Sequence, residues 1–156
     1  MNLWLMKTFQ DWANIFVNAN TPYVAIDEDG VGADLSALDK EGRTSLFTGL
    51  RLNRPNHNWG LIRRFFDDFY NEMNAGDIIV LGIGQRTTFN VVAVCRVSGY
   101  ACFVPVNEPR HRRDVELLWR GDPVPVPDWG YARRLERLDT NEQLKKFITV
   151  YTNLVC

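Results

Sequence analysis

Residues 109–129, PRHRRDVELLWRGDPVPVPDW, join a basic segment to an apolar one and end in a run of prolines. Val115, Leu117 and Trp119 fall at every second position, which predicts a β-strand at 113–119 with these three side chains on its core face. The prolines that follow predict an irregular connection over 121–130. Two explanations of the basic residues remain open. They form a charged strand edge that deters pairing with other chains, or they contact the phosphates of a nucleic acid.

The rest of the chain predicts an α+β fold around this strand. Apolar residues at helical spacing predict helices at 9–18, 58–77 and 140–151, and apolar runs predict strands at 3–7, 22–27, 78–84, 89–100 and 101–106. Residues 27–45, rich in Gly and Asp, predict a loop with one helical turn. Consecutive short strands late in the chain favour a strongly bent mixed β-sheet, or a small barrel, flanked by helices.

Composition is that of one globular domain, which we expect to span residues 1–156. Of the 156 residues, 46% are hydrophobic and 24% charged, so disorder is not expected. The net charge of −1 argues against indiscriminate binding to polyanions. The three cysteines show no metal-ligand spacing, and the apolar start of the chain is too short for a secretory signal. A reducing, cytoplasmic location is therefore expected.

Motifs for catalysis, metals or cofactors are missing from the sequence. His57 and His111 stand far apart and lack a companion HxxxH or CxxC pattern, so no zinc site is expected. The pair Asp27 and Asp29 is a common arrangement in acidic loops. Residues 81–86, LGIGQR, follow a predicted strand but no helix follows them, so they fail the context test for a dinucleotide site. The sequence thus predicts a protein that is not an enzyme and holds no cofactor.

Three segments, in order, resemble the PUA-like superfamily, specifically its EVE and YTH-like branch. LWLMKT (3–8) is similar to the first strand of EVE domains. RRFFDDFYNEMNAGDIIVLGIG (63–84) with NVVAVCRVSGY (90–100) is similar to their helix, Gly-Asp turn and strand pair. HRRDVELLW (111–119) resembles a basic strand of the PUA-like domains attached to modified-DNA-dependent restriction systems of the Mcr and Mrr type. The resemblance covers roughly residues 3–120.

The resemblance implies a non-catalytic module that binds nucleic acid, with DNA favoured over RNA and the choice between them left open, as the specificity part of a restriction or defence system. Such domains flip a modified base, for example a methylated one, into an aromatic-lined pocket. A nuclease or NTPase subunit or domain would then be a partner, and no membrane is involved. The candidate base and backbone contacts are Lys7, Thr8, Tyr23, Asp27, Glu28, Trp59, Arg110, His111, Arg112, Arg113, Trp119 and Trp129.

The sequence leaves several of these roles open. Trp59 is either a hydrophobic anchor at the start of a helix or an exposed platform for a base. The alternation of its strand places Trp119 on the core face. The position of Trp129 suits a cap over the end of a barrel as well as the wall of a binding groove. At Asp27 or Glu28 the restriction-associated relatives have an aromatic residue that walls the pocket. An acid there would hydrogen-bond the amino group of a base, or it would indicate a different ligand.

Two other classes of function compete with a nucleic-acid reader. The first is a module of the same fold that binds a small molecule, a nucleotide or a protein, which the near-zero net charge and the acid at the pocket position favour. The second is a small hydrolase that uses Cys102, paired with His111, or a pair of acids.

Overall fold

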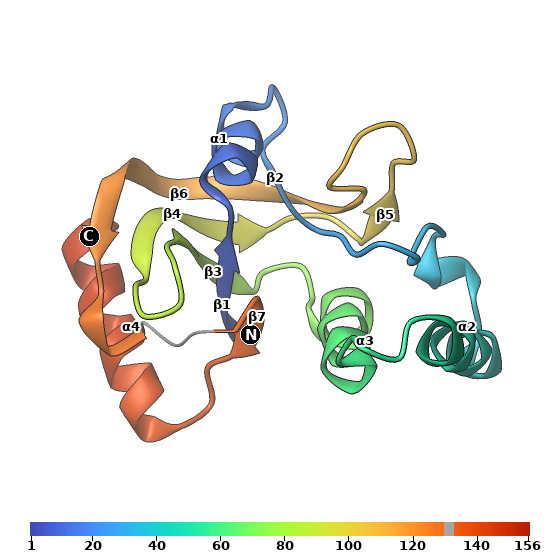
Figure 1. Ribbon diagram of the computed structural model, residues 1–156. Helices are drawn as coiled ribbons and strands as arrows, with labels where there is room; N and C mark the ends of the chain where they lie inside the picture. The colour runs from blue at the N-terminus through green and yellow to red at the C-terminus, as the bar shows by residue number, and fades with distance from the viewer. Residues whose placement is uncertain (130–132) are drawn as a thin grey trace.

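The computed structural model describes residues 1–129 and 133–156, and it shows an α+β chain built on a strongly curled mixed sheet (Figure 1). The strand order is β2-β6-β4-β3-β1-β7, and β5 also pairs with β6. Only β1 and β3 run parallel among the described pairs. The strands are β1 (Leu3–Thr8), β2 (Tyr23–Ile26), β3 (Ile78–Ile83), β4 (Asn90–Val97), β5 (Cys102–Phe103), β6 (His111–Pro125) and β7 (Leu135–Arg137).

Helices cover both faces of this sheet. On one face α1 and α3 pack against β1, β3 and β4 through a cluster that includes Phe16, Phe65 and Phe66. On the other face Phe147 of α4 packs against Val80 and its neighbours. The α-helices are α1 (Gln10–Asn18), α2 (Lys40–Asn53), α3 (Trp59–Asp67) and α4 (Asn141–Leu154), joined by the short turns η1 (Leu35–Ala37), η2 (Asp68–Glu72, a π-helical turn) and η3 (Pro127–Trp129). None of the described helices is long and apolar enough to span a bilayer.

Strand β6 joins β2 and β5 to the β4-β3-β1-β7 part of the curled sheet. Its first residues pair with β2 on one side and with β5 on the other, and the remainder pairs with β4. The strand continues to Pro125, beyond the predicted end at Trp119. Proline is tolerated there because β4 pairs with only one edge of this part of β6.

An irregularity in β6 corrects one prediction about side-chain direction. Cys95 pairs with Leu117, but the next β4 residue, Val94, pairs with Trp119, so Leu118 is an extra residue. An extra residue in one strand reverses the alternation beyond it. Trp119 therefore packs on the α4 face, opposite to Val115 and Leu117.

Helix α2 begins inside the segment 27–45, which the sequence predicted to be a loop with one helical turn, and it continues to Asn53. Gly42, Gly49 and neighbouring Thr and Ser residues lower its intrinsic helix propensity. It forms because Asp39 caps it, accepting a 2.7 Å hydrogen bond from the Gly42 N–H, and because Phe47 is buried against α3. Tertiary packing outweighs local propensity in this segment.

Candidate ligand-binding pocket

A pocket of about 410 Å³ lies where the two ends of the curled sheet approach each other. The ends of β1 and β2, the start of α1 and the turn between β3 and β4 surround it. Sites for small ligands typically have volumes of about 300–1,000 Å³. The lining residues are Met6, Lys7, Thr8, Phe9, Trp12, Ala25, Ile26, Asp27, Gly84, Gln85, Arg86 and Arg134. The set includes three of the sequence candidates, Lys7, Thr8 and Asp27.

Lys7 lines the pocket and connects β1 to the β3–β4 turn. Its Nζ donates a 2.5 Å hydrogen bond to the Gln85 carbonyl in the β3–β4 turn. Burial lowers the pKa of the Lys7 ammonium. The turn also requires Gly84, which has φ +142° and lies so close to Thr88 that a Cβ would be 2.5 Å from its carbonyl oxygen. The turn is thus held in one shape beside the pocket.

Two aromatic side chains of α1, Phe9 and Trp12, form the apolar wall. Their ring centroids are 5.3 Å apart and the ring planes meet at 85°. Trp12 is half-buried, whereas Phe9 is 70% exposed. Neither residue was among the site residues predicted from the sequence. The sequence contains one indication that Phe9 is unusual. It occupies the N-cap position of α1, where Ser, Thr, Asp or Asn is usual.

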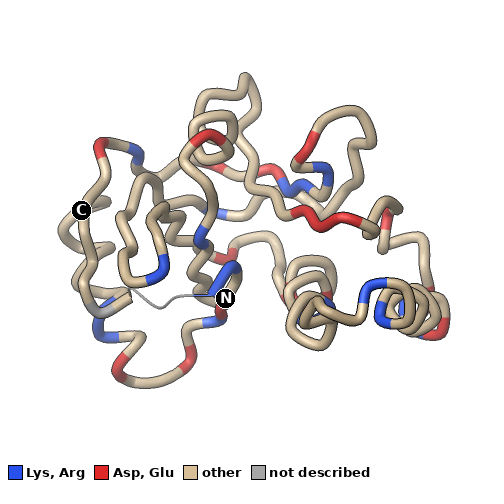
Figure 2. The backbone as a smooth tube through the Cα atoms, in the orientation of Figure 1, with Lys and Arg blue, Asp and Glu red and all other residues tan. Residues whose placement is uncertain are grey.

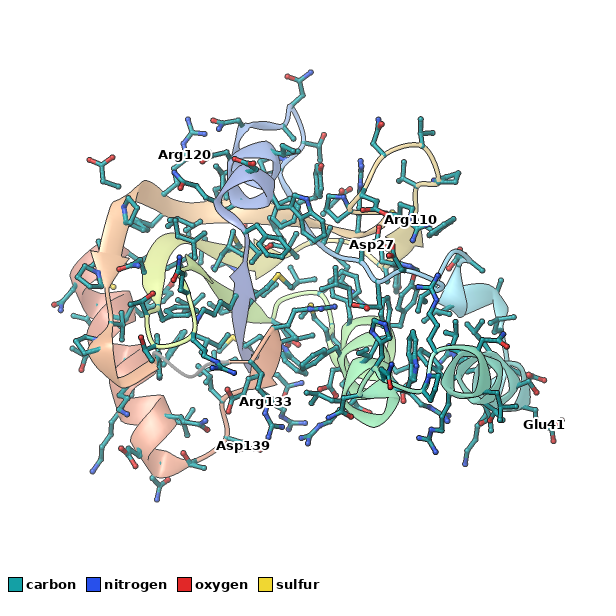
Figure 3. All side chains as sticks on the ribbon, viewed as in Figure 1. Asp27, Glu41, Arg110, Arg120, Arg133 and Asp139 are labelled. Atoms are coloured by element: carbon teal, nitrogen blue, oxygen red, sulfur yellow. The ribbon has the colours of Figure 1, made fainter. Side chains whose placement is uncertain are left out.

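Asp27 is held by Arg110, as Figure 3 shows. The carboxylate accepts four hydrogen bonds of 2.7–2.8 Å, three from the Nε, Nη2 and backbone N of Arg110 and one from the backbone N of Glu28. Burial alone would raise the pKa of Asp27, but these hydrogen bonds and the Arg110 charge outweigh it and lower the pKa. A carboxylate has about four acceptor positions. Asp27 therefore has none left for the amino group of a base, which corrects that prediction.

Arg134 closes the network behind this wall. Its Nη1 donates to the Asp27 carbonyl at 3.0 Å and to Glu28 Oε2 at 3.1 Å, and its guanidinium lies 5.6 Å from the centre of the Phe65 ring. The other carboxylate oxygen of Glu28 lies 3.7 Å from His57 Nδ1. Glu28 does not line the pocket, so its interactions favour a role in joining β2 to β7.

His111 is buried and has both ring nitrogens occupied. Nε2 lies 2.7 Å from the Val31 carbonyl, which can only accept, so Nε2 carries the proton and Nδ1 accepts from the Tyr70 hydroxyl at 2.6 Å. Burial lowers the pKa of His111 and raises that of Tyr70, which fits this neutral arrangement. The expected contact of His111 with a ligand is therefore not supported.

The neighbouring arginines are also engaged within the protein. Arg113 is buried and donates to the carbonyls of Phe69, Gly99 and Tyr70 at 2.8–3.3 Å. Arg112 donates to the Pro109 and Asn107 carbonyls and lies 4.6 Å from the centre of the Tyr23 ring. Phosphate contacts by Arg110 and Arg113 are not supported, because their donors already have buried partners.

The candidate aromatic residues lie outside the pocket. Trp59 is 2% exposed at the start of α3, where its Nε1 donates to the Arg54 carbonyl at 2.7 Å, so the helix-anchor interpretation holds and the exposed platform is wrong. Trp129 is buried edge-on against Phe89 at 5.9 Å. Tyr23 is buried between Phe16 and Arg112. None of the three offers a free ring face to a base.

Charged residues are spread along the chain, with basic and acidic positions interspersed (Figure 2). At the pocket mouth Arg86 is exposed and makes no hydrogen bond or ion pair within residues 1–129 and 133–156. The Thr8 hydroxyl and the Gln85 carboxamide likewise have no side-chain hydrogen bond in the described part of the chain. These three polar groups are the ones that a ligand in the pocket can reach without breaking existing bonds.

Comparison with known proteins gives structural likeness only. No family model matches the chain, and no curated protein sequence matches it. Protein Atu2648 from Agrobacterium tumefaciens is similar with a TM-score of 0.44 and 12% identity, over 96% of this chain and 92% of that one. Rpa0253 from Rhodopseudomonas palustris is similar with a TM-score of 0.40 and 12% identity, over 99% and 82%. At these TM-scores the likenesses assign neither a family nor a function.

Proposed function

We propose that this chain is a PUA-like, EVE/YTH-type module that binds nucleic acid by holding one base in the pocket between β1, α1 and β2. The observation that carries the proposal is an aromatic-walled pocket beside Lys7 and Thr8, the region that the family resemblance assigns to a base site. Base stacking on an aromatic ring contributes about 1–3 kcal/mol for each base. As the resemblance implies, the base would be a modified one in DNA, and the module would serve a restriction or defence system.

The pocket offers separate groups for each part of such a base. The Trp12 ring provides a stacking surface, and Met6, Ala25 and Ile26 provide an apolar floor that suits a methyl group. The Gln85 carboxamide has one donor and one acceptor side, which complements adjacent donor and acceptor positions on a base edge. In the proposed complex Gln85 and Thr8 hydrogen-bond to the base, while Asp27 holds Arg110 and the adjoining wall of the pocket in place.

A small planar ligand is the alternative that one observation favours. Arg110 and Arg113 are occupied within the protein, so at the pocket itself Arg86 is left for a phosphate. Binding to duplex DNA loses affinity with salt with a logarithmic slope of about −0.9 for each phosphate neutralised. We therefore expect a shallow slope for this module. A ligand bound without phosphate contacts would show almost none.

Cys102 and His111 are not arranged as a nucleophile and its base. Burial raises the pKa of the Cys102 thiol, which reduces the reactive thiolate. Both nitrogens of His111 are engaged with Tyr70 and Val31. The described residues contain no group of three His, Cys, Asp or Glu side chains that could hold a metal ion. We accordingly propose binding rather than catalysis.

Trp12→Ala is expected to weaken oligonucleotide binding by about 5- to 150-fold, because a stacked base is worth about 1–3 kcal/mol. The measurement is fluorescence anisotropy with methylated and unmodified oligonucleotides over a salt series. Trp12→Phe should keep most of the affinity, since it keeps a ring. Tyr100→Ala is the matched control, because Tyr100 is 92% exposed and lies outside the pocket.

Two results of this experiment would contradict the proposal. Wild-type protein that binds no oligonucleotide at low salt would rule out a nucleic-acid reader. Binding that Trp12→Ala leaves unchanged, in a protein whose thermal unfolding shows an intact fold, would place the nucleic acid elsewhere on the surface.

A further inference from the structure

We propose that Phe9 is a wedge that enters the duplex and fills the space left when the target base turns into the pocket. This inference rests on the proposed function and adds a step to it, namely how the base is brought out of the stack. The observations behind it are the exposure of Phe9, the orientation of its ring against Trp12 and its place on the pocket rim.

Phe9 is an aromatic side chain left largely in water. It is 70% exposed, while Trp4, Phe16, Phe66, Phe69 and Phe89 are fully buried. Its backbone at the N-cap of α1 is extended, with φ −78° and ψ 151°, and its side chain makes no cap hydrogen bond. The position thus requires no aromatic residue for the helix, since the Phe9 carbonyl that accepts from the Ala13 N–H belongs to the backbone.

The angle between the Phe9 and Trp12 rings gives the two side chains different roles. Because the planes of Phe9 and Trp12 meet at 85°, one flat base can lie parallel to only one of them. Trp12 is half-buried and packs against the core, so it is fixed as the stacking surface inside the pocket. Phe9 touches Trp12 edge-on and extends from it into solvent, where it can reach a neighbouring part of the same ligand.

A duplex supplies a partner for such a side chain. Proteins that unstack bases insert apolar side chains, among them Phe, Leu, Ile and Met, between base steps. Turning a base out of a duplex costs stacking and pairing energy, and a ring placed in the gap restores stacking for the bases on either side. Phe9 and Arg86 both line the pocket, so an inserted ring and a phosphate contact would both adjoin the flipped base.

The test compares duplex and single-stranded oligonucleotides of the same sequence, each with the modified base, by fluorescence anisotropy. Phe9→Ala is expected to weaken duplex binding by about tenfold, because the gap is then unfilled, and to change single-strand binding by less than about twofold. Phe9→Leu should recover most of the duplex affinity, since leucine also serves as a wedge. Trp12→Ala should weaken both complexes, and Tyr100→Ala neither.

A second measurement detects the gap that the flipped base leaves in the stack. With 2-aminopurine placed next to the target base, wild-type protein should raise the fluorescence of the duplex, and Phe9→Ala should raise it less. Equal losses on duplex and single strand with Phe9→Ala would overturn the wedge and leave base binding standing. Unchanged duplex binding would overturn it as well, whereas a wild-type protein that binds neither oligonucleotide would overturn the proposed function instead.

Discussion

Asp27→Asn is expected to lower the free energy of unfolding by about 3 kcal/mol, the lower end of the range for breaking a buried ion pair. The side chain of Asp27 is 3% exposed and that of Arg110 is 20% exposed. An asparagine would turn an N–H₂ group toward the guanidinium and leave Arg110 without its charged partner. Urea unfolding followed by circular dichroism measures the change.

The exposed pair Arg96–Glu116 provides the matched control for this variant. Its N–O distance is 3.0 Å, but both side chains are about half in water. Exposed pairs contribute at most about 1 kcal/mol, so Glu116→Gln should change stability far less than Asp27→Asn. Equal effects of the two substitutions would show that the Asp27 network does not hold the pocket wall.

The pH dependence of stability should show the same network. Because the pKa of Asp27 is lowered in the folded state, its contribution is present above the unfolded pKa of about 3.9. It is lost as the pH falls through the folded pKa. The wild-type protein should therefore lose more stability than Asp27→Asn between pH 5 and the acid limit of folding, and the two unfolding curves should converge.

Trp59→Ala is expected to cost about 3–5 kcal/mol of stability, the usual range for removing a buried tryptophan. The substitution leaves a cavity beside Phe47 and removes the hydrogen bond to the Arg54 carbonyl. Leu52→Ala in the neighbouring helix α2 is the control, because Leu52 is exposed and should change stability by no more than about 0.5 kcal/mol.

Trp59 also separates the two interpretations that its sequence context allowed. Trp59→Phe should stay folded and bind oligonucleotides as the wild type does, because the pocket lies elsewhere. A stable Trp59→Ala protein that has lost affinity would mean that the residue is a base platform after all.

Local sequence patterns predicted the main helices and the general form of the sheet. The apolar face of α3 and η2, with Phe65, Phe66 and Phe69 buried, follows from helical spacing, and the curled mixed sheet follows from the run of short strands. The predicted helix start at residue 140 is confirmed, because a capping box of Thr140 and Gln143 begins α4. The helical features are decided by residues within a few positions of one another, whereas the strand order of the sheet joins segments far apart in the chain.

The site depended on contacts that no local pattern contains. Asp27 and Arg110 are 83 positions apart, and only the pairing of β2 with β6 brings them together. The extra residue Leu118 reversed the direction of Trp119. A helical pattern also cannot tell which apolar side chains meet the core, so Phe9 and Trp12 went unrecognised while the more conspicuous Trp59 and Trp129 were chosen.

The most direct test of the base pocket uses the indole N–H signals of the five tryptophans in a ¹H–¹⁵N spectrum, assigned through single Trp→Phe variants. The protein is titrated with a single-stranded oligonucleotide that carries the modified base. The proposed base pocket predicts that the Trp12 signal shifts while those of Trp59 and Trp129 stay in place. A shift of Trp59 or Trp129 with Trp12 unmoved would contradict it.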